Sequence, residues 1–172
     1  MASFTLHPFE PVPFPLTITG TVEQGGNLAI AYHMQGDLTG LFFPPQATPQ
    51  RRDLLWETTC LEAFMALPGS DLYWELNLSP SGAWQLYRFQ SYRTGMAVET
   101  GISDLTTQID HRPNSFNLSV ALDLNPLGLA DQPLALGITA VIATTAGELS
   151  YWALHHPGPV ADFHDRRGFK IL

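Results

Sequence analysis

The amino-acid sequence predicts an all-β protein, an antiparallel β-sandwich with jelly-roll-like connections and no long helices. In many segments apolar residues alternate with polar ones at a period of two, which is typical of half-buried strands. Fourteen Gly and fourteen Pro are spread along the 172 residues and supply turns between short segments. No segment shows ten or more residues with the 3.6 periodicity of an amphipathic helix. Many short strands separated by turns favour two packed antiparallel layers.

The first part of the chain predicts a hairpin after an extended lead-in. Four prolines between residues 8 and 15 favour an extended, non-helical segment. Residues 16–22 and 28–34 each alternate cleanly, and the sequence Gln-Gly-Gly-Asn at residues 24–27 supplies the turn between them. Further prolines make residues 35–50 a loop.

The second half of the chain predicts the remaining strands of both layers. Residues 116–124 carry five apolar side chains on one face, and residues 134–145 form a long β-branched run that favours burial on both faces. Residues 90–101 and 155–168 are polar and predict loops. In chain order, the expected strands are residues 16–22, 28–34, 60–67, 73–78, 84–89, 102–109, 116–124, 134–145, 149–154 and 169–172, with single helical turns within residues 51–59 and 125–130.

Composition and charge limit the classes of protein to be considered. With 45% hydrophobic and 14% charged residues, the chain is expected to fold as one domain over residues 1–172. A net charge of −8, with a single Lys, argues against nucleic acid and anionic membranes as partners. One Cys and an N-terminus without a signal-peptide pattern predict a cytoplasmic protein. The oligomeric state stays open.

Residues 53–84 contain the most informative pattern of the sequence, a predicted hairpin with acids inside its strands. In residues 60–67, Glu62 lies on the side opposite the aliphatic residues. In residues 73–78, Glu75 and Asn77 lie opposite Trp74 and two leucines. Because the aliphatic sides need a core, the two acids are expected on one shared opposite face. That face is either a solvated surface or the floor of a binding site.

Two neighbouring carboxylates allow four interpretations. They could act as acid and base on a glycosidic bond, or accept hydrogen bonds from sugar hydroxyls. They could instead be solvated, or each could pair with an Arg, for which Arg88 and Arg93 are the candidates. The residue types alone leave this choice open.

Aromatic residues gather in the same region and predict a wall on which a ring could stack. Indole rings stack on the apolar faces of sugars, and such sites add a few polar groups that fix orientation. Trp56 precedes the first strand of the hairpin and is the best platform. Trp74 lies on the aliphatic side and is expected in the core, whereas Trp84 follows a turn and stays undecided.

The polar loop at residues 155–168 is rich in groups that could bind a ligand or a metal. It contains His155, Asp162 and His164 among other His and Asp residues. Metal-binding motifs of the HxH or HExxH type and Cys ligands are absent from it. Hydrogen bonds within the loop are the simpler explanation, so no metal ligand is assigned.

Three motifs together resemble the DOMON-like proteins of bacteria, which are grouped with the family 9 carbohydrate-binding modules. They are WETTCLEAF at residues 56–64, YWELNLSPSGAW at residues 73–84, and YWALHHP at residues 151–157 followed by DFH at residues 162–164. The resemblance covers residues 16–172 and implies a β-sandwich. It also implies a sugar held between two Trp, with an acid and an Arg that bond its hydroxyls.

The resemblance assigns roles to particular residues. Trp56 matches the first clamp residue and Glu62, six positions later, matches the acid. Arg88 is the match for the Arg, and Trp152 is the nearest counterpart of the second clamp Trp, with Phe163 as the alternative. Structural calcium, which family 9 modules carry, is an open implication. Haem, which some DOMON domains bind through Met and His, is the lesser option because nothing pairs a Met with a His.

The expected function is non-catalytic binding of a small ligand, a saccharide, in an aromatic-walled cleft with carboxylate and Arg groups. The alternatives are a hydrolase that uses Glu62 and Glu75 or the His155–Asp162–His164 loop, a protein-interaction module, and a haem-binding DOMON domain. The expected ligand-binding residues are Trp56, Glu62, Glu75, Asn77, Trp84, Arg88, Trp152, His155 and His164. No catalytic residue is assigned, and no cofactor is expected.

Overall fold

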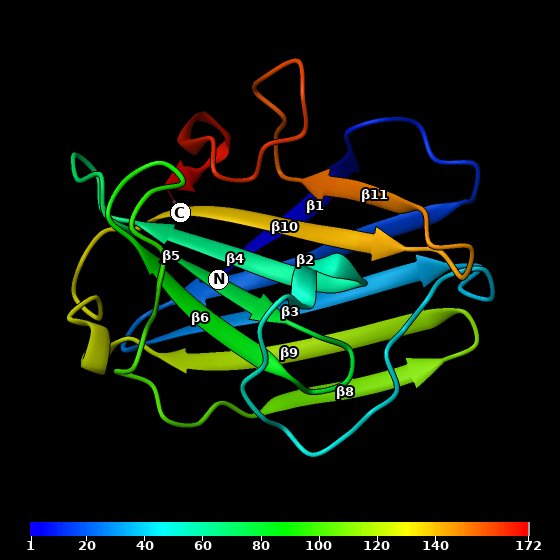
Figure 1. Ribbon diagram of the computed structural model, residues 1–172, viewed down its shortest axis with the longest axis horizontal. Coiled ribbons are helices and arrows are strands. Elements are labelled where there is room, and N and C mark those ends of the chain that lie inside the picture. The colour runs from blue at the N-terminus through cyan, green and yellow to red at the C-terminus, as the bar shows by residue number, and fades with distance from the viewer. Residues whose placement is uncertain (172) are drawn as a thin grey trace.

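The computed structural model describes residues 1–171 and confirms a nearly all-β, antiparallel architecture (Figure 1). The helical elements in this range are three 3₁₀ turns, η1 (Leu55–Glu57), η2 (Asn125–Leu127) and η3 (Arg166–Gly168). The strands are β1 (Ala2–Pro8), β2 (Leu16–Gln24), β3 (Asn27–Gly36), β4 (Cys60–Ala66), β5 (Tyr73–Leu78), β6 (Trp84–Phe89), β7 (Ala97–Val98), β8 (Thr107–Arg112), β9 (Ser115–Asp123), β10 (Ala135–Ala143), β11 (Leu149–Ala153) and β12 (Lys170–Ile171).

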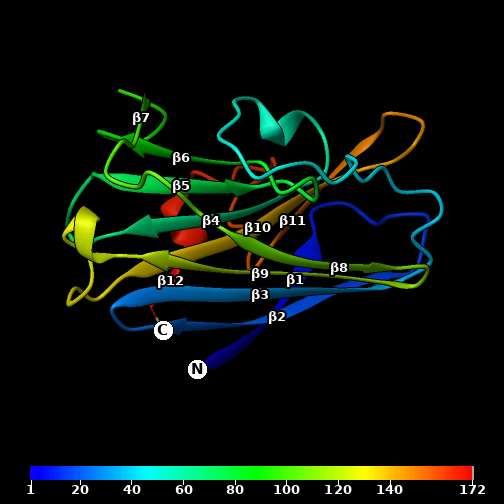
Figure 2. The same cartoon turned by 90° about the horizontal axis from the view of Figure 1, so that it is seen from below.

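The two layers of the sandwich belong to one continuous sheet that curls over on itself. Its strand order is β7-β6-β5-β4-β10-β11-β1-β2-β3-β9-β8, and β12 pairs with β10. Strand β1 joins the layers, because Ala2–Leu6 pair with β2 while His7 and Pro8 pair with β11. Figure 2 shows the layers edge-on, with β4, β5 and β6 in one and β2, β3 and β9 in the other. We call them the β4–β5 layer and the β3–β9 layer.

The main hydrophobic core fills the space between the layers. Leu118 and Leu122 of β9 face Leu61 and Leu76 of the opposite layer in one cluster, and all four side chains are buried. The hydroxyl group of Tyr32 crosses between the layers and donates a hydrogen bond of 2.7 Å to the backbone carbonyl of Glu62. Burial of this apolar surface is the main driving force for the closed sandwich.

Most strands lie where the alternation predicts them, and the differences have local causes. Strands β5 and β6 match at both ends, β4 and β9 match within one residue, and β2, β3 and β10 match within two. Strand β1 is an unpredicted strand, since the prolines suggested only an extended lead-in while Phe4 and Leu6 carry the alternation. Strand β8 begins at Thr107, later than expected, because Ile102 and Leu105 reach the core from an irregular segment. For the expected closing strand 169–172, Leu172 lies outside the described residues.

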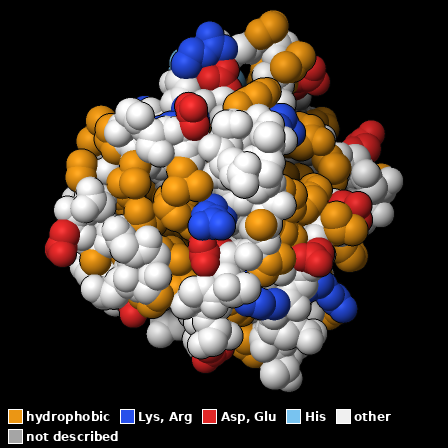
Figure 3. All heavy atoms as spheres, turned by 60° about the vertical axis from the view of Figure 1, so that its left-hand side comes forward, with side chains coloured by type: hydrophobic (Ala, Val, Ile, Leu, Met, Phe, Trp, Pro, Cys, Tyr) orange, Lys and Arg blue, Asp and Glu red, His pale blue; other side chains and the backbone are white. Residues whose placement is uncertain are grey.

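The surface carries few basic groups. Figure 3 shows Lys and Arg side chains that lie apart from one another on this face, mixed with acidic and hydrophobic ones. No helix within residues 1–171 is long and apolar enough to cross a membrane.

Candidate functional site

The outer face of the β4–β5 layer is not a solvated surface. Every residue of β4 and β5 is buried, including the side chains that point away from the main core. A second, smaller hydrophobic cluster covers this face, with Phe64, Tyr73, Tyr87 and Phe89 at its centre and Trp56, Phe163 and Phe169 packed against them. The covering residues come from the segment around η1 and from the C-terminal loop, so two irregular segments close over the sheet.

The strand register brings the two acids together on this face. Glu62 of β4 lies opposite Asn77 of β5 on one side and opposite Thr139 of β10 on the other. Phe64, two residues along β4, lies opposite Glu75. Glu62 and Glu75 are therefore diagonal neighbours on adjacent antiparallel strands, within reach of one common ligand.

A pocket of about 450 Å³ opens above these acids. A cavity of this size matches the lower range of small-molecule sites. Its walls are largely aromatic and aliphatic, and its polar groups are few. The lining residues are Trp56, Glu57, Glu62, Phe64, Glu75, Phe89, Arg93, Met96, Val141, Leu149, Tyr151, Ala161, Phe163 and His164.

Each carboxyl group at the floor uses one oxygen for a hydrogen bond within the protein. Thr139 Oγ1 donates to Glu62 Oε2 at 3.1 Å, and Asn77 Nδ2 donates to Glu75 Oε1 at 2.8 Å. The second oxygen of Glu75 lies 3.8 Å from His164 Nε2, which is too long for a hydrogen bond. One oxygen of each acid is thus available to a ligand.

Burial changes the protonation behaviour of this floor. Burial raises the pKa of Glu62 well above its ordinary value, and the nearby charge of Glu75 raises it further. Burial also raises the pKa of Glu75, although the Asn77 hydrogen bond and nearby Arg93 act in the opposite direction. Both carboxyl groups of the site therefore hold their protons to a higher pH than an exposed glutamic acid does.

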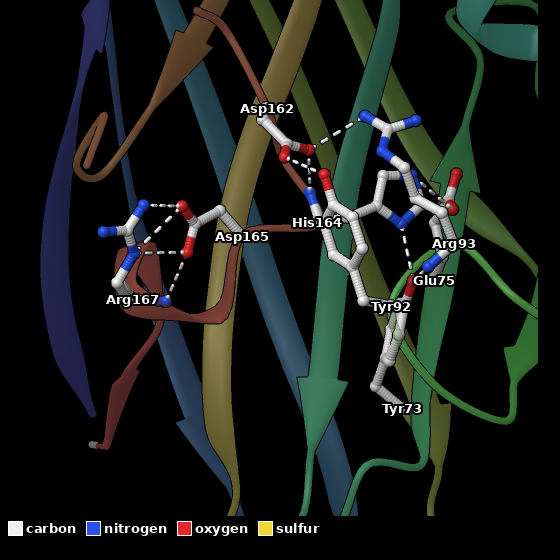
Figure 4. A network of polar contacts seen from close by, with 8 residues as sticks. All are labelled: Tyr73, Glu75, Tyr92, Arg93, Asp162, His164, Asp165 and Arg167. Carbon is white, nitrogen blue, oxygen red and sulfur yellow. Dashed lines mark hydrogen bonds and ion pairs between the residues drawn. The ribbon is translucent and has the colours of Figure 1, made fainter. Parts of the chain in front are cut away.

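His164 is attached to the sheet through Tyr73 (Figure 4). The Tyr73 hydroxyl accepts a hydrogen bond of 3.1 Å from the backbone N–H of Arg93 and lies 2.7 Å from His164 Nδ1. Burial and the charge of Arg93 lower the pKa of His164 to about 4, so the ring is neutral at pH 7. With Tyr73 as the donor to Nδ1, the ring proton lies on Nε2, the nitrogen nearer Glu75.

Arg93 is held at the pocket by Asp162 of the C-terminal loop. Its Nη2 atom lies 2.8 Å from Asp162 Oδ1, and Tyr92 donates a hydrogen bond of 2.6 Å to Asp162 Oδ2. Asp162 Oδ1 also accepts from the backbone N–H of His164 at 3.1 Å. This network fixes the loop that carries His164 and Phe163 against the segment after β6.

The backbone is strained at two positions beside the pocket. Leu54 and Arg93 are the non-glycine residues within 1–171 that have positive φ, at 60° and 51°. Such conformations cost free energy and persist where the surrounding structure fixes them, often at binding sites. Leu54 directly precedes η1 and sets the direction of Trp56, and Arg93 lines the pocket itself.

Trp56, for which the sequence predicts the role of a stacking platform, lines the pocket. It is half-buried and packs edge-to-face on Tyr87, with 5.8 Å between the ring centroids. Asp53 anchors the segment before it by accepting hydrogen bonds from Gln85 Nε2 at 3.0 Å and the Tyr87 hydroxyl at 2.7 Å. The ring is therefore held in place while part of it stays accessible.

Of the nine predicted site residues, four line this pocket: Trp56, Glu62, Glu75 and His164. Asn77 lies beneath them, where it is fully buried and orients Glu75. His155 lies elsewhere, beside Gly137 and Phe169 in a small crevice. His155 lies apart from the pocket because residues 155–162 follow an irregular path, and the period-two pattern of strands does not predict the path of a loop.

Three other predicted residues are corrected by the structure. Arg88 pairs with Trp74 in the β5–β6 register, so it belongs to the sheet face opposite the two acids. Trp84 and Trp152 are each 2% exposed and belong to the main core. For Arg88 and Trp84 the cause is the same, because they share the side of β6 that carries Leu86.

The sequence did not predict all of the residues that line the pocket. Some of the others lie in loops, and the rest are apolar strand residues whose pattern is that of a core. Arg93 lines the pocket at the place expected for Arg88. The sequence predicts Arg93 only as a candidate ion-pair partner of the two acids. Phe163, the alternative for the second clamp, lines the pocket where Trp152 does not. Phe64 and Phe89 alternate in phase with the acids, and this is the signal that could have identified them.

A larger hollow of about 770 Å³ lies on the outer face of the β3–β9 layer. Its lining is mainly Ser, Thr, Asn and Gln with His33, whose Nδ1 atom lies 2.6 Å from Asn117 Oδ1. The polar side chains there are exposed or partly exposed, as on the outer face of an ordinary antiparallel sheet. We therefore place the candidate site in the smaller pocket, whose floor carries two buried acids among aromatic side chains.

Metal ligands are not clustered in this structure. No group of three or more His, Cys, Asp or Glu side chains within residues 1–171 is arranged to hold a metal ion.

Comparisons with known proteins identify the fold. No protein-family model matches the chain, and no curated protein matches it either. Among solved structures, a candidate carbohydrate-binding protein from Bacteroides uniformis aligns over 96% of this chain and 84% of its own, with 11% identity and a TM-score of 0.66.

A family 9 carbohydrate-binding module from Caldicellulosiruptor kristjanssonii also aligns, in two complexes. The glucose complex covers 95% of this chain and 78% of its own, with 10% identity and a TM-score of 0.54. The cellotriose complex covers 92% and 74%, with 10% identity and a TM-score of 0.52. At these identities the comparisons show a shared fold, and that fold occurs in carbohydrate-binding proteins.

Proposed function

We propose that this protein binds a saccharide, without catalysis, in the pocket above Glu62 and Glu75. The observation that carries the proposal is the combination of a fixed, partly exposed indole ring with two buried carboxyl groups that each keep one oxygen free. A pyranose ring presents an apolar face for stacking and hydroxyl groups at its edge, so it matches both features. The shared fold with carbohydrate-binding proteins supports the same ligand class, and we extend the proposal to kinship with the DOMON-like proteins.

Phe163 is proposed as the second aromatic contact of the sugar. It is half-buried, lines the pocket, and packs edge-to-face on Tyr151 with 6.0 Å between the centroids. Arg93 is proposed as the basic group at the site in place of Arg88. Its ion pair with Asp162 engages Nη2, which leaves further guanidinium donors for a hydroxylated ligand.

Binding and hydrolysis differ in what they require of the two acids. A glycosidase needs one protonated and one ionised carboxyl group, so its environments push the two pKa values apart. Here burial raises the pKa of both Glu62 and Glu75. We assign both acids to hydrogen bonding with hydroxyl groups of the ligand, and incubation with an oligosaccharide tests for hydrolysis.

Tryptophan fluorescence provides a direct test, because the four Trp differ in exposure. Trp74, Trp84 and Trp152 are at most 4% exposed, and Trp56 is the partly exposed one. Titration with glucose, cellobiose and a panel of other mono- and disaccharides should therefore change the emission through Trp56. The change should disappear in Trp56→Phe and persist in the control Trp74→Phe, provided that both variants fold.

Two further measurements complete the test. Glu62→Gln should weaken binding of the same sugar at least ~10-fold, because the carboxyl group that bonds the sugar hydroxyls is replaced, while the variant stays folded in thermal melts. Incubation of the bound oligosaccharide with the protein should leave it intact. A panel in which no saccharide binds would overturn the proposal, and cleavage of the ligand would replace it with the hydrolase.

A further inference from the structure

The charges that line the pocket are unbalanced. The acids Glu57, Glu62 and Glu75 line it, and Arg93 is the single Lys or Arg among the lining residues. That guanidinium group is already 2.8 Å from Asp162, which supplies a further negative charge beside it. An anionic ligand would thus meet an excess of acidic groups, with the one basic group already paired.

The floor of the pocket lacks a positive partner of its own. Glu62 is 2% exposed and Glu75 is 6% exposed, and their hydrogen bonds come from the neutral groups of Thr139 and Asn77. For Glu62 Oε1, the residues 1–171 provide no hydrogen-bond donor, and the free oxygen of Glu75 has His164 Nε2 at 3.8 Å. Buried carboxylates without a paired charge are costly, and a ligand that brings the charge would relieve that cost.

Aromatic rings surround the same space. Trp56, Phe64, Phe89, Tyr151 and Phe163 all line the pocket. The faces of such rings attract cations, most strongly where water is excluded. Carboxylates at the floor and aromatic rings at the walls are together the features that recognise an organic ammonium group.

We propose that the pocket prefers a saccharide with a free amino group, an amino sugar in its ammonium form, over a neutral or anionic sugar. The inference rests on the proposed saccharide binding and narrows its ligand class. The ammonium group would donate to Glu62 Oε1 and Glu75 Oε2, the two oxygens that the protein leaves free, while the pyranose ring stacks on Trp56. Sugar phosphates, sugar nucleotides and uronic acids are excluded by the same charges.

Isothermal titration calorimetry with matched sugars tests the preference on the full chain. The probes are glucosamine, glucose, N-acetylglucosamine and glucose 6-phosphate, with the disaccharide of glucosamine matched to cellobiose. A pH of about 6.5 keeps the amine charged, since it lies below the pKa of ordinary α-amino groups. We expect glucosamine to bind at least ~10-fold more tightly than glucose, and glucose 6-phosphate to bind more weakly than glucose.

The outcomes separate this inference from the proposed function. Glucose or N-acetylglucosamine that binds as tightly as glucosamine would overturn the amino-sugar preference and leave saccharide binding intact. Absence of binding by every sugar in the series, and in the wider panel described above, would overturn both. Preference for glucose 6-phosphate would also contradict the inference, because it would require a basic site.

Variants locate the preference in the floor of the pocket. Glu62→Gln should lower the ratio of glucosamine to glucose affinity several-fold, since one of the two acids that pair with the ammonium group is gone. Glu75→Gln is the second variant, in case the first does not fold. Asp104→Asn, which removes an exposed acid outside the pocket, should leave the ratio unchanged. A ratio that survives in both folded floor variants would overturn the inference.

Discussion

The Tyr73 hydroxyl lies 2.7 Å from Nδ1 of His164, across 91 residues of sequence, and this contact joins the C-terminal loop to the floor of the pocket. Strand β5 supplies the tyrosine and the loop after β11 supplies the histidine, whose other nitrogen lies 3.8 Å from Glu75. The position of His164 in the pocket therefore depends on the hydroxyl group of Tyr73, a side chain of strand β5.

Tyr73→Phe should lower the free energy of unfolding by about 1–2 kcal/mol, because the hydroxyl group bonds both His164 Nδ1 and the backbone N–H of Arg93. The phenyl ring keeps its stacking on Phe89, at 4.8 Å between centroids, so the loss reports the hydroxyl group. Urea unfolding measures it. The matched control is Tyr151→Phe, whose ring is 39% exposed and which should change stability by less than ~0.5 kcal/mol. Equal effects in both variants would show that the Tyr73–His164 contact adds nothing.

His164 should make the protein less stable in mild acid. Its pKa is lowered from 6.5 to about 4 by burial, so the unfolded state binds a proton first. Stability from this residue is complete above pH 6.5 and is lost as the pH falls towards 4, by at most about 3 kcal/mol. In His164→Asn the loss between these pH values should shrink, whereas in the control His7→Asn, at an exposed position, it should persist. Urea unfolding midpoints measured across this pH range test the prediction. The same loss of stability in His164→Asn as in the unmodified protein would contradict it.

Glu62 should act in the opposite direction at higher pH. Burial raises its pKa well above 4.5, so the folded state holds the proton longer than the unfolded state. Its contribution is complete below pH 4.5 and is lost as the pH rises through the raised pKa. Glu62→Gln should therefore gain stability relative to the unmodified protein as the pH increases. A stability difference that stays constant between pH 5 and 9 would contradict this.

Leu118→Ala and Leu122→Ala should each lower the free energy of unfolding by roughly 2–5 kcal/mol, because both side chains are 0% exposed in the main core. On the opposite face of β9, Ser119→Ala should cost about 0.5 kcal/mol or less, and Asn117→Ala, which also removes the contact with His33, about 1 kcal/mol. Urea denaturation of the four variants compares the faces directly. Similar losses in both pairs would mean that the outer face of β9 is packed rather than solvated.

Leu54→Gly should not destabilise the protein, although glycine usually does. Leu54 has a φ of 60° and a side chain that is 53% exposed, so glycine relieves strain and removes little buried surface. We expect a free energy of unfolding that is equal or up to about 1 kcal/mol higher. Leu54→Val should be less stable than either, since β-branched residues tolerate this conformation poorly. Thermal melts rank the three proteins, and a clear loss in Leu54→Gly would show that the leucine packs on Trp56.

The sequence determined the strands of the β4–β5 layer and the faces on which their side chains lie. A period of two leaves little freedom once one face must reach the core, so Glu62 and Glu75 had to share the other face. Trp56 could also be identified, because its short segment leads directly into β4.

Tertiary structure decided which residues complete the pocket. Arg88 and Arg93 differ by five positions, yet the β5–β6 register turns the first away, and a left-handed residue in a loop brings the second to the pocket. Phe163 and His164 reach the same place from the far end of the chain, held by Asp162 and Tyr73. Local periodicity carries no information on such contacts, since the path of a loop depends on the partners that it meets only in the folded protein.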